Sequence, residues 1–292
     1  MRRSEALDPD TPAGQASPRL PDELIGGDRL VFIGGLHRSG TSLVHRCLAD
    51  HPLIGGLENT GVPEDEGQHL QAVYPTGAVH GGPGVFGFAA EAHLDETSDL
   101  VSPENAKRIL ESWLPYWTTG QTYLVEKSPP NLIRTRFLKA LFPGARFVIV
   151  MRHPLAVSFA TRKWTTWLPA LRRFGISNQR LPRLSLDRLL RHWLLCHEAF
   201  EADRSALGDD VHVFRYEDFV ERPVEVLGRV HDFLGVEDAP LSRAIQTGVN
   251  DKYFEEWKVM ANGLLSGRYA SHLVRRHEAR VNRFGYSLER LD

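Results

Sequence analysis

The sequence predicts an α/β fold with three layers, in which helices flank a central parallel sheet. Two observations support this prediction: short apolar runs alternate with longer helical patterns, and the apolar runs are continuous. Continuous apolar runs are typical of strands that are buried on both faces, as in a parallel sheet covered by helices. The 292 residues, of which 42% are hydrophobic and 25% charged, are enough for one large globular domain.

The expected elements follow from the spacing of apolar residues and from helix-starting prolines. The predicted strands are residues 29–35, 122–127, 146–152 and 211–218. The predicted helices are residues 41–50, 103–113, 131–141, 186–206 and 223–234, with a further helix starting at 154. Segments 54–90 and 164–184 break the alternation, and long irregular segments of this kind often form lids or substrate loops. Residues 1–27 are predicted to be a disordered leader, and residues 28–292 the domain.

Composition excludes several classes of function. The net charge of −2 gives no basic field for nucleic acid, so any anion site must be built locally. Cys47 and Cys196 lie in apolar stretches and are expected to be buried thiols, which favours a reducing, cytoplasmic location. The sequence contains neither a CxxC nor an HExxH motif, so it gives no support for a metal site. The N-terminal residues lack the apolar core expected of a signal peptide, and the apolar run 147–151 is expected to be too short to span a bilayer.

The loop after the first strand, "GLHRSGTS" (35–42), has the GxxxxG spacing of a phosphate-binding loop. Thr41 stands where a nucleotide-binding P-loop has lysine, and Arg38 supplies a cation inside the loop instead. Glycines let backbone N–H groups point into one concavity, and a helix starting near Thr41 adds its positive dipole end. The alternative is a glycine turn without a ligand. We predict a P-loop-like anion site formed by Arg38, Ser39, Gly40, Thr41 and Ser42.

A second cation, Arg152, ends the strand at 146–152. Open α/β sheets bind ligands at the carboxyl ends of their strands, so Arg152 should lie on the same edge as the first loop. Pro154 then favours a helix, with Ser158 and Thr161 in its first turns. A charged residue at a strand end is often only solvated. Together with the loop, however, Arg152 predicts a ligand that carries two separated anionic groups.

Several longer segments carry a resemblance to a known family: "GLHRSGTSLV", "VEKSPPNL", "LFPGARFVIVMRHPLAVS", "FRYEDFVERPVEVLGRVHDFLGV" and the late "FGYSL". In these segments the chain resembles sulfotransferases that use 3′-phosphoadenosine 5′-phosphosulfate (PAPS), especially bacterial and tyrosylprotein-type members. The resemblance implies a single sulfotransferase domain that moves a sulfuryl group from PAPS to a hydroxyl acceptor by direct in-line transfer. It implies no metal, because a sulfuryl group carries less charge than a phosphoryl group and arginine with backbone donors can stabilise the leaving phosphate.

The resemblance also implies which residues bind the donor. The family's first loop binds the 5′-phosphosulfate, which assigns that role to residues 38–42. Its second site binds the 3′-phosphate through an arginine, matched by Arg152, and a serine. The family's serine lies eight residues after the arginine, where this chain has Ala160, so Ser158 is the nearest candidate. Trp257 and Lys258 match a late Trp-Lys element that packs near the nucleotide in relatives.

Transfer to a hydroxyl needs a general base within hydrogen-bond reach. In tyrosylprotein relatives a glutamate shortly after the first helix has this role, and Glu58 in "GLENTG" lies one residue from that register. His69 is the rival base, because an imidazole suits proton transfer near neutral pH. The neighbouring acids, residues 64–66, are expected to cap a helix or to lie in solvent.

Lys127 in "VEKSPP" follows a strand, and the resemblance places it in the active site, where it would offset charge on the sulfuryl oxygens together with Arg38. The alternative for Lys127 is an ion pair with Glu126 or with a loop carboxylate.

Two other functions compete with this interpretation. A P-loop kinase for a small molecule would need the missing loop lysine and a magnesium-binding acid. A catalytically inactive nucleotide-binding protein would have no use for Lys127 or for a base. The acceptor is expected to be a small molecule or a tyrosine-like phenol. Trp164, Trp167, Phe174 and the loop 74–90 are compatible with an apolar pocket for it and equally with packing in the core. The sequence does not indicate an oligomeric state.

Overall fold

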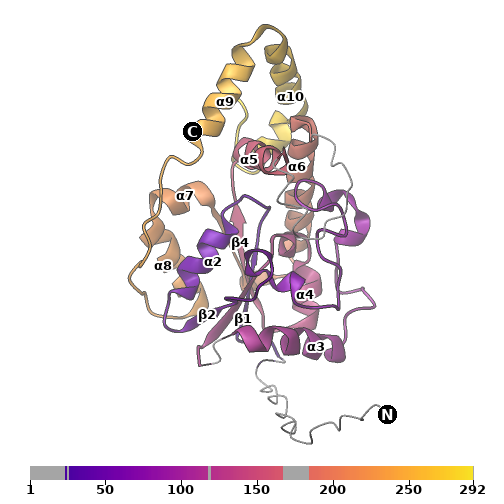
Figure 1. Cartoon of the computed structure of the whole chain (residues 1–292), viewed down its shortest axis with the longest axis vertical. Helices are drawn as coiled ribbons and strands as arrows, with labels where there is room; N and C mark the ends of the chain where they lie inside the picture. Colours follow the sequence, from indigo (N-terminus) through magenta and orange to yellow (C-terminus); the bar gives the residue numbers. More distant parts are fainter. Residues whose placement is uncertain (1–23, 25, 118–119, 167–183, 292) are drawn as a thin grey trace, which may run out of the picture.

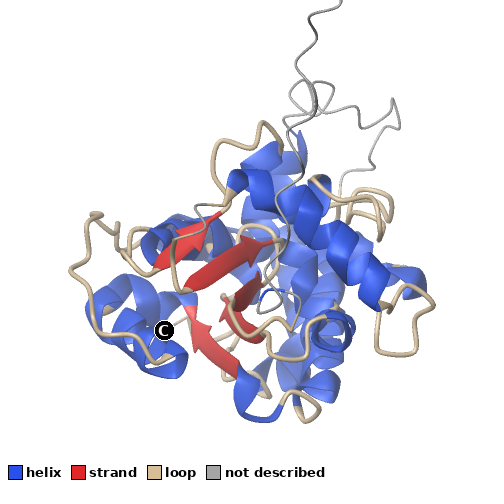
Figure 2. Cartoon of the chain, turned by 90° about the horizontal axis from the view of Figure 1, so that it is seen from below, coloured by secondary structure: helices blue, strands red, loops and turns tan. Residues whose placement is uncertain are grey.

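The structure is a computed structural model and describes residues 24, 26–117, 120–166 and 184–291. In this part of the chain one sheet contains five parallel strands in the order β2-β3-β1-β4-β5. The strands are β1 (Leu30–Gly34), β2 (Ile54–Gly56), β3 (Tyr123–Lys127), β4 (Arg146–Met151) and β5 (Val211–Arg215). Helices lie on both sides of the strands (Figure 2), which confirms the predicted three-layer α/β fold.

Each face of the sheet has its own hydrophobic core, and β1 contributes to both. Val31 and Ile33 pack with α2 (Thr41–Ala49), α7 (Tyr216–Glu221) and α8 (Pro223–Leu234). Leu30 and Phe32 point to the opposite face. That face is covered by α3 (Pro103–Trp113), α4 (Thr135–Leu141), α5 (Pro154–Thr166) and α6 (Leu186–Arg204). Because successive strand residues alternate between faces, the continuous apolar sequence of β1 requires burial on both sides.

Helices α9 (Asp251–Asn262) and α10 (Leu264–Asn282) form a hairpin beyond the sheet. They pack against each other, α9 also contacts α5, and α10 contacts α6. In Figure 1 the hairpin forms the narrow upper end of the molecule. The sequence pattern did not predict this hairpin or the three-residue strand β2.

Two predicted boundaries are wrong. The strand expected over 211–218 ends at Arg215, because its partner β4 ends at Met151 and further residues have no strand to pair with. Glu217 lies in the first turn of α7 instead, where a carboxylate is favourable. The helix expected over 131–141 begins at Thr135, after a 3₁₀ turn over Pro129–Ile133.

The ends and the irregular segments are only partly described. Leu24 is buried, and the N–H of Gly144 donates a hydrogen bond to the carbonyl of Gly26, so these residues of the predicted leader pack on the domain. Residues 1–23 lie outside the described residues, as do Trp167 and Phe174 of the predicted acceptor pocket. Cys47 and Cys196 are buried and unpaired, as predicted. None of the described helices is both long and apolar enough to cross a bilayer.

Candidate functional site

The loop that was predicted to bind an anion connects β1 to α2. Gly40 precedes the first helical residue, Thr41, with a φ of 95°, a left-handed conformation that favours glycine. A Cβ atom on Gly40 would lie 2.3 Å from the ring of Tyr216, so the loop packs directly on this ring. Within the described residues no group accepts a hydrogen bond from the N–H of Thr41 or Ser42. Two donors therefore remain at the positive end of α2, which suits an anion.

Arg152 is fixed to this loop by a direct hydrogen bond. Its Nη1 atom donates to the carbonyl oxygen of Arg38 at 2.7 Å, while Nε and Nη2 donate to Oδ1 of Asn250 at 2.9 and 2.6 Å. These bonds use three of the five guanidinium N–H groups, so two donors remain. Burial lowers the pKa of Arg152, but a guanidinium stays charged at neutral pH. Among the described residues, no carboxylate forms an ion pair with Arg152 or with the exposed Arg38.

Aromatic and polar groups fix the orientation of Arg152. The guanidinium carbon lies 4.4 Å from the ring centroid of Tyr216 and 5.9 Å from that of Tyr253. Glu217 accepts a hydrogen bond at 2.6 Å from the amide nitrogen of Asn250, which presents the amide oxygen to Arg152. Since the Tyr216 ring touches both the loop and Arg152, it joins the two predicted anion sites at one edge of the sheet.

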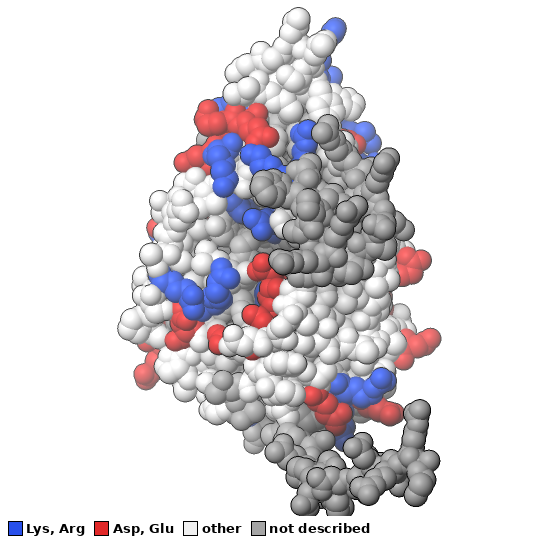
Figure 3. All heavy atoms as spheres, viewed as in Figure 1, with Lys and Arg blue, Asp and Glu red and all other residues white. Residues whose placement is uncertain are grey.

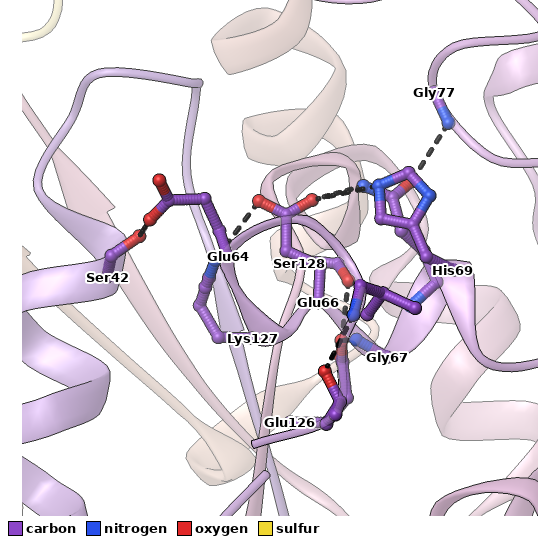
Figure 4. A network of polar contacts seen from close by, with 12 residues as sticks. Ser42, Glu64, Glu66, Gly67, His69, Gly77, Glu126, Lys127 and Ser128 are labelled. Atoms are coloured by element: carbon purple, nitrogen blue, oxygen red, sulfur yellow. Dashed lines mark hydrogen bonds and ion pairs between the residues drawn. The ribbon is translucent and has the colours of Figure 1, made fainter. Parts of the chain in front are cut away.

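A buried ion pair lies near the same edge (Figure 4). Lys127, the last residue of β3, pairs in the sheet with Ile33 of β1, and its Nζ atom donates to Oε1 of Glu66 at 3.0 Å. Gln68 donates to Oε2 of Glu66 at 2.5 Å, and Nε2 of His69 lies 3.7 Å from the same oxygen. The expectation that Glu66 caps a helix or lies in solvent is wrong, because its side chain is only 7% exposed and its carboxylate pairs with Lys127.

The other two acids of that segment tie it to its surroundings. Ser42, in the first turn of α2, donates a hydrogen bond to Oε2 of Glu64 at 3.1 Å. Oδ1 of Asp65 accepts from the N–H of Thr60 at 2.9 Å and from its hydroxyl at 2.6 Å. Neither acid caps a helix of the described fold through its side chain. The segment carrying Glu66 is therefore linked to the start of α2, the helix that follows the loop predicted to bind an anion.

Glu126 is not the partner of Lys127. Its Oε1 atom accepts from the N–H of Gly67 at 2.9 Å and from the hydroxyl of Ser128 at 2.5 Å, and its Oε2 atom accepts from Asn131 at 2.7 Å. Burial raises the pKa of Glu126 to about 7, against the effect of these hydrogen bonds. Glu126 thus positions the turn that follows Glu66.

The two predicted bases lie in different surroundings. Glu58 is exposed, and no described residue forms a hydrogen bond or ion pair with its side chain. The structure does not bring it into contact with Lys127 or with the loop. His69 lies beside Glu66, and burial lowers the pKa of its imidazole, which favours the neutral ring.

Two serines that were predicted to bind the donor are buried, and their hydroxyls have no hydrogen-bond partner among the described residues. They are Ser39, in the loop, and Ser158, on α5. Ser158 faces a cavity of about 10 Å³ that His37 also lines, and burial lowers the pKa of His37 to about 3. No described contact joins Ser158 to Arg152, and Ala160, at the family's serine position, is buried. Buried hydroxyls without a partner are costly, and the cavity at Ser158 has room for about one water molecule.

Trp257 and Lys258 lie on α9, the helix that also carries Tyr253. Trp257 is buried, and its indole N–H donates to the carbonyl of Leu288 at 2.9 Å. Lys258 is exposed and pairs with Glu255 at 2.7 Å. Within the described residues neither side chain contacts the loop or Arg152.

Three residues of the site were not identified from the sequence: Glu66, Asn250 and Tyr216. A lysine at the end of a buried strand needs a nearby counter-charge, so "VEKSPP" contained a signal for Glu66 or an equivalent acid. Tyr216 was assigned to a strand. Asn250 follows an irregular segment 98 residues after Arg152, and no sequence pattern pairs the two.

Comparisons with known proteins agree with the fold and the motifs. A family described as "Sulfotransferase family" matches residues 31–240. Among curated proteins, Nodulation protein NoeE of Sinorhizobium fredii (strain NBRC 101917 / NGR234) is 28% identical over 230 residues. The match covers 72% of this chain and 51% of that protein, so the chain spans about half the length of this relative.

Solved structures show a similar fold at low sequence identity. Sulfotransferase STF1 from Mycobacterium tuberculosis H37Rv has a TM-score of 0.50 and 15% identity, with 80% of this chain and 78% of that chain covered. A sulfotransferase from Alicyclobacillus acidocaldarius has a TM-score of 0.45 and 19% identity, with 86% and 95% covered.

Proposed function

Because the chain belongs to the sulfotransferase family, we propose that it transfers a sulfuryl group from PAPS to a hydroxyl acceptor. The observation that carries the proposal is the hydrogen bond from Arg152 to the carbonyl of Arg38. It fixes the cation proposed for the 3′-phosphate to the loop proposed for the 5′-phosphosulfate. One rigid unit therefore offers two anion sites, as a donor with two separated anionic groups requires.

The residues present fit such a donor. The unbonded N–H groups of Thr41 and Ser42, the buried hydroxyl of Ser39 and the side chain of Arg38 are proposed to bind the phosphosulfate. The two remaining N–H donors of Arg152 are proposed to bind the 3′-phosphate. Ser158 stays the predicted partner of this phosphate, and its unpartnered hydroxyl supports the assignment. Trp257 and Lys258 are proposed only as outer contacts of the nucleotide, since they lie on α9.

In the proposed in-line step, the acceptor oxygen forms a bond to sulfur while the bond from sulfur to the bridging phosphate oxygen breaks. The electron pair of that bond stays on the phosphate of the leaving nucleotide. Arg38 and the positive end of α2 stabilise this developing charge. The proton of the acceptor hydroxyl moves to a general base.

We assign the base to Glu66. Its carboxylate is oriented by Lys127 and Gln68, and the segment that carries it is tied to Ser42 through Glu64. Glu58 is exposed and lacks such contacts, and His69 is placed to orient Glu66. Lys127 is proposed to hold the carboxylate in position and to offset charge on the sulfuryl oxygens.

The acceptor is proposed to be a small molecule or a tyrosine-like phenol. A cytoplasmic location is proposed as well, which the two buried, unpaired cysteines support. The family match does not favour a P-loop kinase.

The test is incubation of the full chain with sulfur-labelled PAPS and a panel of phenols and tyrosine peptides, with and without EDTA. We expect labelled product in the presence of EDTA, because the cations of the site are side chains. Magnesium-dependent phosphoryl transfer from ATP would favour the kinase. Tight binding of the desulfated donor product without transfer to any acceptor would favour an inactive nucleotide-binding protein.

A further inference from the structure

The turn between α9 and α10 exposes large apolar side chains. Leu264 is 91% exposed and Leu265 is 77% exposed at the start of α10, and Val259 near the end of α9 is 73% exposed. In Figure 1 this turn forms the upper tip of the molecule, beyond the layers of the fold. Three large apolar side chains at one protruding turn are unusual for a surface that faces only water.

Basic side chains predominate on α10 next to this tip, whereas the acids Glu255 and Glu256 lie on α9. Residues 257–277 include no Asp or Glu, but they include Lys258, Arg268, Arg275 and Arg276. Lys258 and Arg276 form ion pairs with Glu255 and Asp187, whereas Arg268 and Arg275 are exposed and have no ion pair with a described residue. On the face shown in Figure 3, the very top of the molecule is white with a few blue atoms, and a red patch lies just below it beside further blue atoms.

A cleft opens beside the hairpin. It has a volume of about 620 Å³ and is lined by residues of α9, α10 and the segment 288–291. Three cations (Lys258, Arg275 and Arg290) and one carboxylate (Glu289) line it together with apolar side chains such as Trp257 and Val274. Cations next to apolar side chains suit a lipid, whose phosphate is anionic and whose acyl chains are apolar.

We propose that the α9–α10 tip docks on an anionic lipid bilayer, with Leu264 and Leu265 inserted below the headgroups. Arg268, Arg275 and Arg290 would contact the lipid phosphates. A second copy of the chain is a poorer partner, because stable protein interfaces bury about 800 Å² on each side, which two leucines on a convex turn do not supply. Insertion of a few apolar side chains next to cations is sufficient for reversible membrane binding.

Leu264, Leu265 and the three arginines have no role in the proposed sulfuryl transfer, although the cleft shares Trp257 and Lys258 with the proposed outer contacts of the nucleotide. The test therefore does not use enzyme activity. The full chain is floated with vesicles of phosphatidylcholine, with or without phosphatidylserine, at low and at high salt. We expect binding to the anionic vesicles only, weakened by salt. Leu264→Ser with Leu265→Ser should reduce the partition coefficient by at least about tenfold. Arg268→Gln with Arg275→Gln should reduce it about fivefold for each charge removed.

Val79→Ser is the matched control, because Val79 is 71% exposed in a different loop. This variant should bind vesicles like the wild type. The proposal is overturned if the wild type does not bind anionic vesicles or if the double leucine variant binds them equally well. It is also overturned if the leucine substitutions abolish a dimer in solution while vesicle binding persists, since the tip would then be an interface between copies.

Discussion

Lys127 and Glu66 form a buried ion pair in which Nζ lies 3.0 Å from Oε1, although 61 residues separate them along the chain. The lysine side chain is fully buried and the glutamate side chain is 7% exposed. Keeping two charges out of water is costly unless each has a partner. We therefore expect the pair to affect the rate of sulfuryl transfer as well as the stability of the fold. Both quantities can be measured.

The first prediction concerns the base. Glu66→Gln keeps the size of the side chain and its bond from Lys127 but cannot accept a proton. Single-turnover sulfuryl transfer at saturating donor should fall about a hundred- to ten-thousand-fold. The affinity for the desulfated donor product should stay within about twofold, because Glu66 faces the acceptor in this proposal.

Glu58→Gln and His69→Ala are the comparison variants for that experiment. Glu58→Gln should transfer sulfate at the wild-type rate, because this side chain is exposed and has no described partner. His69→Ala should have an intermediate effect, since the ring lies 3.7 Å from Glu66. If the transfer rate falls in Glu58→Gln but not in Glu66→Gln, the expectation from sequence resemblance is right and the assignment to Glu66 is wrong.

The second prediction concerns the donor. Arg38→Ala should weaken binding of the desulfated product about tenfold to a hundredfold, because it removes a charge-assisted contact from an exposed side chain. Calorimetric titration measures the effect, and Arg46→Ala, which removes an exposed cation elsewhere on α2, is the control. Equal affinities of the wild type, Arg38→Ala and Arg46→Ala for the desulfated product would contradict the proposal that the loop binds the donor.

The third prediction concerns Asn250. Asn250→Ala removes the acceptor of two hydrogen bonds from Arg152 without removing the cation. Binding of the desulfated product should weaken, whereas binding of an analogue that lacks the 3′-phosphate should not change. A uniform loss for both ligands would mean that Asn250 supports the whole fold rather than the 3′-phosphate site.

The fourth prediction concerns the stability of the ion pair. Lys127→Met should lower the free energy of unfolding by about 3–5 kcal/mol, because it leaves a buried carboxylate unpaired. Adding Glu66→Gln should recover a large part of this loss, since the second change removes the unpaired charge. Urea denaturation of the four proteins gives the coupling energy, and strictly additive effects would show that the two groups do not interact.

The fifth prediction concerns pH. Burial lowers the pKa of His197 from 6.5 to about 4, and it lowers the pKa of His45, His153 and His192 in the same direction. The unfolded chain therefore binds protons first as the pH falls below about 6.5, and the free energy of unfolding decreases until the pH passes about 4. Each such histidine should contribute about 2 kcal/mol to the loss between pH 7 and pH 5.

His197→Gln tests this effect at one position, since the replacement is neutral throughout. Its urea midpoint should depend less on pH than that of the wild type. The same slope in both proteins would show that His197 does not titrate on unfolding.

The four longer strands could be predicted because burial on both faces requires continuous apolar sequence. Strand β2 could not, because Ile54-Gly55-Gly56 is short and is held in place by pairing with β3. Residues 216–218 were wrongly predicted to continue the last strand for a similar reason, because pairing between strands decides where a strand ends. Tyr216 has high strand propensity, but it begins a helix because the neighbouring strand has ended.

The loop and Arg152 were predictable because local sequence builds them: glycine spacing in one case and a strand end in the other. Glu66 and Asn250 act through contacts with residues 61 and 98 positions away. A local pattern cannot reveal such contacts, so Glu66 had the sequence context of a solvated acid. The roles assigned to individual residues stay predictions until the variants are measured.

The bond between Arg152 and Asn250 also has a consequence for biosynthesis. Asn250 lies beyond residue 240, where the family match ends, and it immediately precedes α9. All five strands are complete by Arg215, so the sheet can form on the ribosome while Asn250 is still untranslated. A nascent chain of that length already contains the loop and Arg152, but it lacks the acceptor that holds the guanidinium. The ability to bind a nucleotide should therefore appear late in translation, after the fold itself.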